Sequence, residues 1–309
     1  MSKKATRQAY GEALVELGKI NKNIVVLDAD LTKSTKTNMF QKEFPERHFN
    51  MGISEADMIG TASGLAASGK IAFASTFAIF AAGRAYEQIR NSVAYSKLNV
   101  KIAPTHAGIS VGEDGGSHQM IEDIALMRVV PNMVVLSPAD AVETKKMIFA
   151  AAEYNGPVYI RMGRLDVETI FDEETYEFEI GKANILREGK DLTIIATGLM
   201  TYEAIKAAEI LDKKGISARI INCGSIKPLD KDTIITAAKE TKFIITAEEH
   251  SIIGGLGGAI SELLAEIYPT KVLKIGINDE FGQSGKAQEL LERYELTAAK
   301  IVEIAESNL

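Results

Sequence analysis

The sequence has almost no cysteine, no tryptophan and no excess of basic residues. Cys223 is the one cysteine among 309 residues, which excludes an internal disulfide and a multi-cysteine zinc site and favours a reducing compartment. The formal net charge of -7 argues against a nucleic-acid or anionic-membrane partner, because both require a basic surface. Any phosphorylated ligand would therefore have to be bound by local arginines.

Long apolar stretches are also missing. No uninterrupted apolar run reaches the roughly 18 residues of a membrane-spanning helix, and residues 1–7 have no apolar core like that of a signal peptide. We therefore expect a cytoplasmic protein. A chain of 309 residues exceeds the usual size of one domain, so two domains are the first expectation.

Short β-branched runs alternate with longer amphipathic stretches, which is typical of strands joined by crossover helices. We expect strands at 24–27, 71–74, 100–103, 133–136, 158–160, 192–196, 218–222, 243–246 and 272–275. We expect helices at 6–17, 56–67, 78–92, 139–153, 202–213, 231–239, 256–267 and beyond Lys286. This alternation predicts the α/β class, with mostly parallel sheets between layers of helices.

The alternation is interrupted between residues 166 and 189. Residues 167–175 are acidic and show neither helical nor strand periodicity. We therefore predict a linker at 166–189 between a larger domain, residues 1–165, and a smaller domain, residues 190–309. Both domains are expected to be doubly wound.

Two segments of the first domain combine a helix start with unusual side chains. In the segment 50–60, Ser54 is a plausible N-cap and Glu55 lies in the first helical turn, where the helix dipole favours a carboxylate. In the segment 75–80, Phe77 and Phe80 are three residues apart after a strand. They could stack on a flat heterocycle or pack in the core.

A third segment, residues 105–119, is harder to explain by packing. It contains His106 and His118, two of the four histidines, with an Asp-Gly turn and several further glycines. It follows a strand, where open α/β sheets bind their ligands. Metal binding is the weaker interpretation, because two histidines twelve residues apart with no clear third ligand match no usual zinc pattern.

Together and in order, these segments resemble transketolase. The matching features are Glu55 three residues after Gly52, the Ser-Thr-Phe-x-x-Phe run at 75–80, the Thr-His pair at 105–106 and the Gly-Glu-Asp-Gly-x-x-His-Gln run at 112–119. The likeness extends through residues 5–7 and 29–34 to the tail at 279–286. It implies a thiamine diphosphate pyrimidine-binding domain at 1–165 and a transketolase C-terminal domain at 190–309.

The resemblance implies that this chain binds the pyrimidine end of thiamine diphosphate. Glu55 would form a hydrogen bond with the aminopyrimidine ring, Phe77 and Phe80 would stack on it, and Asp30 would lie near the thiazolium ring. A third aromatic residue often follows one turn later, but that position is Gly83 here. The implied reaction is the transfer of a two-carbon ketol unit from a ketose phosphate to an aldose phosphate in the pentose phosphate pathway.

The same resemblance assigns residues to the sugar phosphate. His106 and His118 would contact substrate hydroxyls and relay protons, since imidazole suits acid-base work near neutral pH, and Asp114 would bind another hydroxyl. The phosphate would be held by Arg7, Ser34 and Arg164. Arg161 is a rival to Arg164; along one strand their spacing would place them on opposite faces, and the family pattern favours Arg164.

One motif of the family is missing from the sequence. Transketolases hold magnesium and the diphosphate with a Gly-Asp-Gly segment and a later Asn in an N-terminal half, and the run at 112–115 is not that motif. We therefore expect no metal ligand in this chain and an N-terminal transketolase subunit as its partner. We expect a heterotetramer that contains a homodimer of this chain.

Three alternatives remain at this point. The chain could be the β subunit of a 2-oxo acid dehydrogenase, a deoxyxylulose-phosphate synthase-like enzyme, or a non-catalytic binding or assembly module. The Thr-His pair with the Gly-Glu-Asp-Gly run argues against the first two, and Glu55, His106 and His118 argue against the third. The glycines at 254–258 mimic a dinucleotide fingerprint but are expected to form a structural turn, and His250 is expected at a surface or interface.

Overall fold

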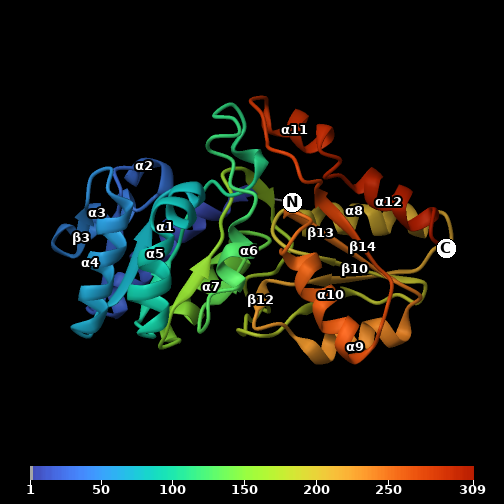
Figure 1. Ribbon diagram of the computed structural model, residues 1–309, viewed down its shortest axis with the longest axis horizontal. Helices are drawn as coiled ribbons and strands as arrows, with labels where there is room; N and C mark the ends of the chain where they lie inside the picture. Colours follow the sequence, from blue (N-terminus) through green and yellow to red (C-terminus); the bar gives the residue numbers. More distant parts are fainter. Residues whose placement is uncertain (1–2) are drawn as a thin grey trace.

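The computed structural model describes residues 3–309 as two α/β units that lie side by side (Figure 1). The first unit is built on a seven-stranded sheet and the second on a five-stranded sheet. The N-terminus lies near their junction, and the C-terminus lies at the far end of the second unit. The expected α/β class with two sheet-based units is therefore confirmed.

The first sheet has the strand order β12-β6-β7-β5-β4-β2-β3. Its strands are β2 (Ile24–Asp28), β3 (His48–Asn50), β4 (Ile71–Ser75), β5 (Val100–Ile102), β6 (Val134–Leu136), β7 (Val158–Ile160) and β12 (Ser225–Lys227). All neighbours are parallel except β12, which pairs antiparallel with β6. Because β12 comes from the second half of the chain, the two units are joined by a shared sheet as well as by side-chain packing.

Helices cover both faces of the first sheet, which is why its central strands are buried along nearly their whole length and are mostly apolar. These helices are α1 (Thr6–Ile20), α2 (Thr32–Thr35), α3 (Asn38–Glu43), α4 (Glu55–Ala67), α6 (Asp123–Arg128) and α7 (Ala141–Glu153), with short 3-10 turns at Pro45–Arg47 and Ile109–Val111. Tyr10 and Leu14 of α1 pack against Phe73 of β4 on one face, and Met58 of α4 packs on the other.

The helix expected at 78–92 has an unusual winding. It consists of π-helical segments η2 (Phe80–Arg84) and η3 (Ile89–Tyr95), with α5 (Tyr86–Gln88) between them. A π-helix has one more residue per hydrogen-bonded turn than an α-helix, and such segments are frequent at functional sites. Side chains from residue 80 onward therefore lie at angles that a uniform α-helix would not give them.

The second sheet has the order β14-β13-β10-β11-β9. Its strands are β9 (Asn184–Arg187), β10 (Leu192–Ala196), β11 (Ala218–Asn222), β13 (Ile244–Ser251) and β14 (Val272–Ile277), all parallel except the edge strand β9. Its helices are α8 (Met200–Asp212), α9 (Lys231–Glu240), α10 (Leu256–Ile267), α11 (Ala287–Arg293) and α12 (Ala298–Glu306). In Figure 1, α8 and α12 lie on one face of this sheet, and α9 and α10 lie on the other.

The segment 166–189 is more regular than its sequence indicates. It contains β8 (Asp166–Glu168), which pairs antiparallel with β1 (Lys3–Ala5), as well as β9, which forms the edge of the second sheet. The sequence pattern did not indicate these two strands, because strands of three and four residues are too short to show a periodic pattern. The domain limits themselves stay a prediction.

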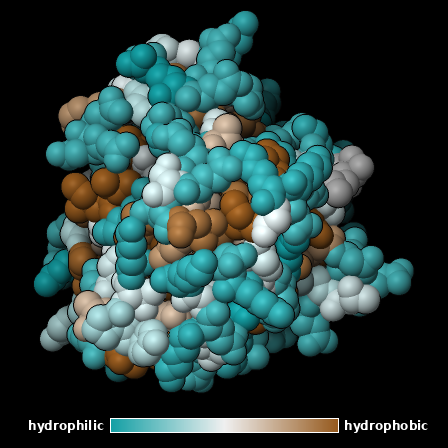
Figure 2. Space-filling model, turned by 90° about the vertical axis from the view of Figure 1, so that its right-hand side faces the viewer, coloured by the Kyte–Doolittle hydropathy of each residue, from teal (hydrophilic) through white to brown (hydrophobic). Residues whose placement is uncertain are grey.

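One apolar cluster runs through both units. It combines Met58 and Ile102 of the first unit with Ile195, Ile234 and Ile260 of the second. At the far end of the second unit, apolar side chains form small groups separated by polar ones (Figure 2). Among residues 3–309, no helix combines the length and the apolar character that crossing a bilayer would require.

Candidate active site at the edge of the first sheet

The predicted site residues lie just after the carboxyl ends of neighbouring strands. Asp30 follows β2, Glu55 follows β3, Phe77 follows β4, His106 follows β5 and Arg164 follows β7. Strands β3, β2, β4, β5 and β7 are adjacent in that order and parallel, so their carboxyl ends meet at one edge. This edge is where open α/β sheets bind ligands.

Glu55 is a buried carboxylate at the start of a helix. It is the first residue of α4, and its side chain is 5% exposed. Ser54 occupies the N-cap position as expected, although its side chain forms no capping hydrogen bond. Arg84 donates a hydrogen bond from Nη1 to Oε1 of Glu55 at 3.2 Å. The carboxylate is therefore shielded from most water but remains accessible to a flat group such as the Arg84 guanidinium.

Two aromatic rings and two histidine rings form one cluster. The rings of Phe77 and Phe80 are nearly parallel with centroids 5.8 Å apart, and Phe77 stacks on His106 at 3.9 Å. His118 meets Phe80 edge-on at 5.5 Å. Phe77 is buried and Phe80 is half-buried, so Phe80 offers the more accessible ring. The aromatic pair and the histidines thus belong to one place.

His106 is held in a fixed orientation. Its backbone is left-handed, with φ of 61°, and the Thr105 hydroxyl lies 2.8 Å from Nδ1. Burial, together with the charges of Arg7 and Arg164, lowers the pKa of His106 to about 3. His106 is therefore neutral at pH 7 and acts as a hydrogen-bonding group there, whereas we expected an imidazole that titrates near neutral pH.

Arg7, Ser34 and Arg164 form the polar end of the site. Arg7 donates from Nε to the carbonyl of Arg164 at 3.2 Å and from Nη1 to the carbonyl of Ser34 at 2.9 Å. Burial and the neighbouring charge of Arg164 lower the pKa of Arg7. The positive charges of the two guanidinium groups repel each other. An anion that contacts both groups would offset this repulsion and would therefore bind favourably.

Arg161 has a different environment from Arg164. Arg161 is 6% exposed, donates from Nε to the carboxylate of Asp123 at 3.0 Å, and donates from Nη2 to the carbonyl of Glu249 at 2.9 Å. Arg164 is 38% exposed and contacts the Val111 carbonyl and the Glu113 carboxylate. Arg164 is thus the arginine of this pair that lies beside Arg7.

Asp28, which we had not singled out, shapes the loop that carries Asp30 and Ser34. It is fully buried and accepts hydrogen bonds from the backbone of Leu31 and from the hydroxyls of Thr35 and Thr37. Burial raises the pKa of Asp28. Asp30 is exposed and left-handed, with φ of 63°, and its side chain accepts from Asn50 at 3.3 Å.

The histidine loop, residues 106–118, rests on the second unit. The backbone of Ser110 donates to Oε1 of Glu249 at 2.7 Å, and Gln119 donates to the carbonyl of Gln283 at 2.9 Å. A Cβ added to Gly282 would lie 1.8 Å from Oε1 of Gln119, so any larger residue there would force the Gln119 side chain to move. The tail segment 279–286 therefore braces this loop, whereas Asp114 at the loop tip is exposed.

The glycines at 254–258 and His250 have structural surroundings. Glu248 accepts hydrogen bonds from the backbone of Leu256 and Gly257, so a carboxylate of the chain already uses these donors of α10. His250 is fully buried and faces α6, where it accepts from the backbone of Ala125 at 3.4 Å. A surface position for His250 is therefore wrong, because the sequence gives no sign that α6 covers it.

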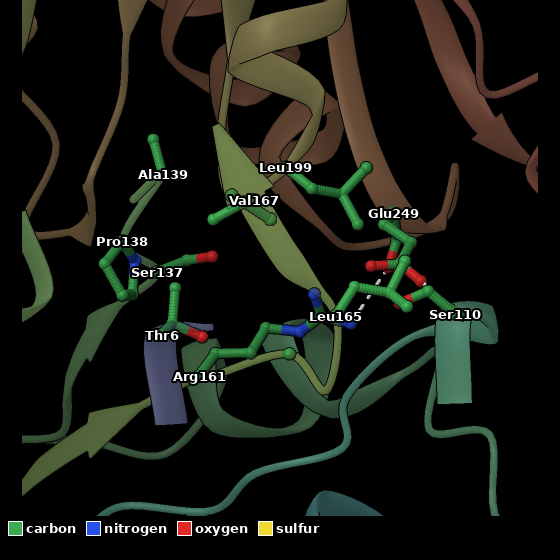
Figure 3. A pocket seen from close by; sticks show the side chains of 12 residues that line it. Thr6, Ser110, Ser137, Pro138, Ala139, Arg161, Leu165, Val167, Leu199 and Glu249 are labelled. Atoms are coloured by element: carbon green, nitrogen blue, oxygen red, sulfur yellow. Dashed lines mark hydrogen bonds between the residues drawn. The ribbon is translucent and has the colours of Figure 1, made fainter. Parts of the chain in front are cut away.

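A small cavity lies at the junction of the two units (Figure 3). Thr6, Ser110, Arg161 and Glu249 line it together with other residues, and its volume of about 20 Å³ suits roughly one water molecule. The hydroxyls of Thr6 and Ser110 are buried with no hydrogen-bond partner among residues 3–309. The cavity can therefore hydrate these groups, but it is too small for a cofactor.

The buried carboxylate and the accessible ring of Phe80 fit the pyrimidine end of thiamine diphosphate. A carboxylate shielded from water forms a strong hydrogen bond with a heterocyclic nitrogen, and an aromatic face accepts a flat ring. Within residues 3–309, no group of three histidine, cysteine, aspartate or glutamate side chains is arranged to hold a metal ion.

Comparison with known proteins agrees with this geometry. Residues 2–169 match the transketolase pyrimidine-binding domain, and residues 181–301 match the transketolase C-terminal domain. A "putative transketolase C-terminal section" of Methanocaldococcus jannaschii is 59% identical over 96% of this chain and 94% of that protein. The "6-deoxy-6-sulfo-D-fructose transketolase subunit SqwH" of Clostridium sp. strain MSTE9 is 42% identical over 97% of this chain and 92% of that protein.

Solved structures show the same fold. A structure described as "split gene transketolase, inactive beta4 tetramer" is 55% identical, has a TM-score of 0.90, and covers 98% of this chain and 97% of its own. A Pichia stipitis transketolase in complex with sedoheptulose 7-phosphate is 26% identical with a TM-score of 0.86, and this chain spans 46% of it. The chain therefore belongs to the transketolase family and corresponds to the C-terminal subunit of a split transketolase.

Proposed function

We propose that this chain is the subunit of a thiamine diphosphate-dependent transketolase that binds the pyrimidine end of the cofactor and the sugar phosphate. The proposal rests chiefly on one observation: the buried Glu55 carboxylate lies at the same sheet edge as the Phe80 ring, the two histidines and the Arg7–Arg164 pair. The reaction would move a two-carbon ketol unit from a ketose phosphate to an aldose phosphate.

Each group has a role that its surroundings suit. When bound, thiamine diphosphate supplies the chemistry that breaks and forms the carbon–carbon bond next to a ketose carbonyl. Glu55 would hold the aminopyrimidine nitrogen, and Phe80 would pack against that ring. His106, which is neutral at pH 7, would accept from or donate to substrate hydroxyls, and His118 would relay a proton from its more accessible position. Asp114 would contact a substrate hydroxyl, and Asp30 would lie near the thiazolium ring.

The phosphate would bind between Arg7 and Arg164. Their guanidinium groups lie on adjacent segments, and a dianion placed between them would relieve their mutual repulsion. The Clostridium relative is described as acting on a sugar with a sulfonate, which is also a tetrahedral oxyanion. The arginine pair is therefore suited to a tetrahedral oxyanion at the end of the sugar, and we propose that this oxyanion is a phosphate for this chain.

The diphosphate and magnesium would be bound by a partner subunit. This chain spans about half of a complete transketolase, and the split relative was described as inactive when it consists of β chains alone. We propose an N-terminal transketolase subunit as partner, in a cytoplasmic heterotetramer built around a homodimer of this chain.

Ketol transfer between defined sugars tests this function. The mixed subunits, with thiamine diphosphate and magnesium, should convert xylulose 5-phosphate and ribose 5-phosphate into the corresponding seven- and three-carbon sugar phosphates. Condensation of pyruvate with glyceraldehyde 3-phosphate would favour a deoxyxylulose-phosphate synthase instead, and decarboxylation of a branched 2-oxo acid would favour a dehydrogenase subunit.

A further inference from the structure

Arg84 lies where its guanidinium group touches both groups of the pyrimidine site. It donates to Oε1 of Glu55 at 3.2 Å, and its Cζ atom lies 4.1 Å from the centroid of the Phe80 ring. These are the carboxylate and the ring that the proposed function assigns to the cofactor. The Arg84 side chain is 53% exposed, so it lies at the mouth of the site and can move into solvent.

The π-helical winding of η2 is what places Arg84 there. Arg84 ends this segment, four residues after Phe80 and directly after Gly83. A Cβ added to Gly83 would meet nothing within 4 Å, so space beside this position is open in the free chain. Position 83 therefore leaves this space unfilled, and the next residue places a flat cation over Phe80.

We infer that Arg84 is a displaceable latch on the pyrimidine site: it pairs with Glu55 and covers Phe80 until the cofactor's pyrimidine takes both contacts. This inference rests on the proposed function. A planar guanidinium and a planar heterocycle need the same carboxylate oxygen and the same side of the site. The two cannot make these contacts at once.

Such a latch would stabilise the chain before it binds its partner. Glu55 is 5% exposed, and a buried carboxylate without a counter-ion is costly. Arg84 supplies that counter-ion before the partner and cofactor arrive. This arrangement weakens cofactor binding. Before the pyrimidine can bind, the ion pair between Glu55 and the exposed Arg84 must be broken, and so must the cation–π contact between Arg84 and Phe80.

Calorimetric titration of thiamine diphosphate into the complete complex tests the latch. With magnesium and the N-terminal partner present, R84Q should bind the cofactor roughly 3- to 10-fold more tightly than the wild type, because no ion pair has to be broken. R90Q is the matched control. Arg90 lies in η3, is exposed and contacts Asn91, so its loss removes the same charge from the same stretch without touching Glu55.

A second measurement uses the free chain. R84Q should lower the unfolding midpoint of the wild-type chain but not of E55Q, because the ion pair is already lost in that variant. Unchanged or weaker cofactor binding by R84Q, or equal effects of R84Q in both backgrounds, would overturn the latch. Absence of cofactor binding by the wild-type complex would instead refute the proposed function itself.

Discussion

The two sides of the site are held in different ways. On one side, Glu55 and Phe80 are positioned by α4 and η2 of the first unit, and Arg84 at 53% exposure is their cover. On the other side, the histidine loop is tied to the second unit through Glu249 and Gln283. The side with the histidine loop is therefore held by contacts from both units, whereas the side with Glu55 and Phe80 is built from the first unit.

The second unit supports the histidine loop. It carries none of the predicted site residues, yet its strand β13 and the tail after β14 contact the loop between His106 and His118. Apart from the loss of the Glu55–Arg84 ion pair, changes on the cofactor side should therefore alter chemistry more than folding. Changes to the tail segment 279–286, which braces the loop, should lower stability and also shift the histidine loop.

The largest effect is expected on the cofactor side. Glu55→Gln should lower the turnover of the mixed subunits by on the order of 10²- to 10⁴-fold, because an amide cannot provide the charged, proton-handling group at this position. Steady-state ketol transfer measures this loss. Asp57→Asn is the control, since Asp57 is an exposed carboxylate in the same first turn of α4. Wild-type turnover by Glu55→Gln would contradict the assignment.

The next effect separates the two arginines after β7. Arg161→Met should destabilise the chain by about 3–5 kcal/mol, because Asp123 would be left buried and without its counter-ion. Denaturant unfolding measures this change. Arg164→Met should cost less than about 1 kcal/mol, since its ion pair is exposed, and should instead raise KM for the sugar phosphate. Equal stability losses in the two variants would refute the distinction.

The brace itself can be tested with a glycine. Gly282→Ala should destabilise the chain by about 1–3 kcal/mol and lower turnover, because the added methyl group would collide with Gln119 and shift the histidine loop. Gly64→Ala is the matched control. It lies exposed in α4 with no atom within 4 Å of an added Cβ, and alanine favours a helix. If both variants unfold at the wild-type midpoint, the tail does not brace the loop.

A pH dependence of stability is expected as well. The pKa of folded His106 is about 3, below the value near 6.5 of the unfolded chain, so the unfolded state binds the proton first. Stability from this residue is complete above pH 6.5 and is lost as the pH falls towards 3. His48, whose pKa burial lowers to about 4, adds to the same slope. Denaturant unfolding from pH 7 to 4 should therefore show a shallower slope for His106→Asn than for the wild type.

Much of the fold follows from local patterns in the sequence. The helix expected at 256–267 and the strands expected at 192–196 and 218–222 have the bounds of α10, β10 and β11. Glu55, Phe77 and His106 come together because each follows a parallel strand, which periodicity and order can predict.

Other features depend on contacts that periodicity does not record. The pairing of β12 with β6 joins residues about 90 positions apart, and the winding of η2 reflects hydrogen bonds within a stretch that reads as an ordinary helix. For that reason, nothing in the sequence marks Arg84 as a residue of the site. Asp28 could have been suspected only as an acidic residue at the end of an apolar run, and Gln119 only as the last residue of the run at 112–119. Glu249 lies between Glu248 and His250, where the sequence gives no such signal.

The central claim is that this chain carries one end of the cofactor site and a partner carries the other. Calorimetric titration of thiamine diphosphate with magnesium, into the chain alone and into its mixture with an N-terminal transketolase subunit, tests this claim directly. We predict tight binding only in the mixture, because Glu55 and Phe80 can hold the pyrimidine but the diphosphate needs the partner. Tight binding by the chain alone would contradict the account.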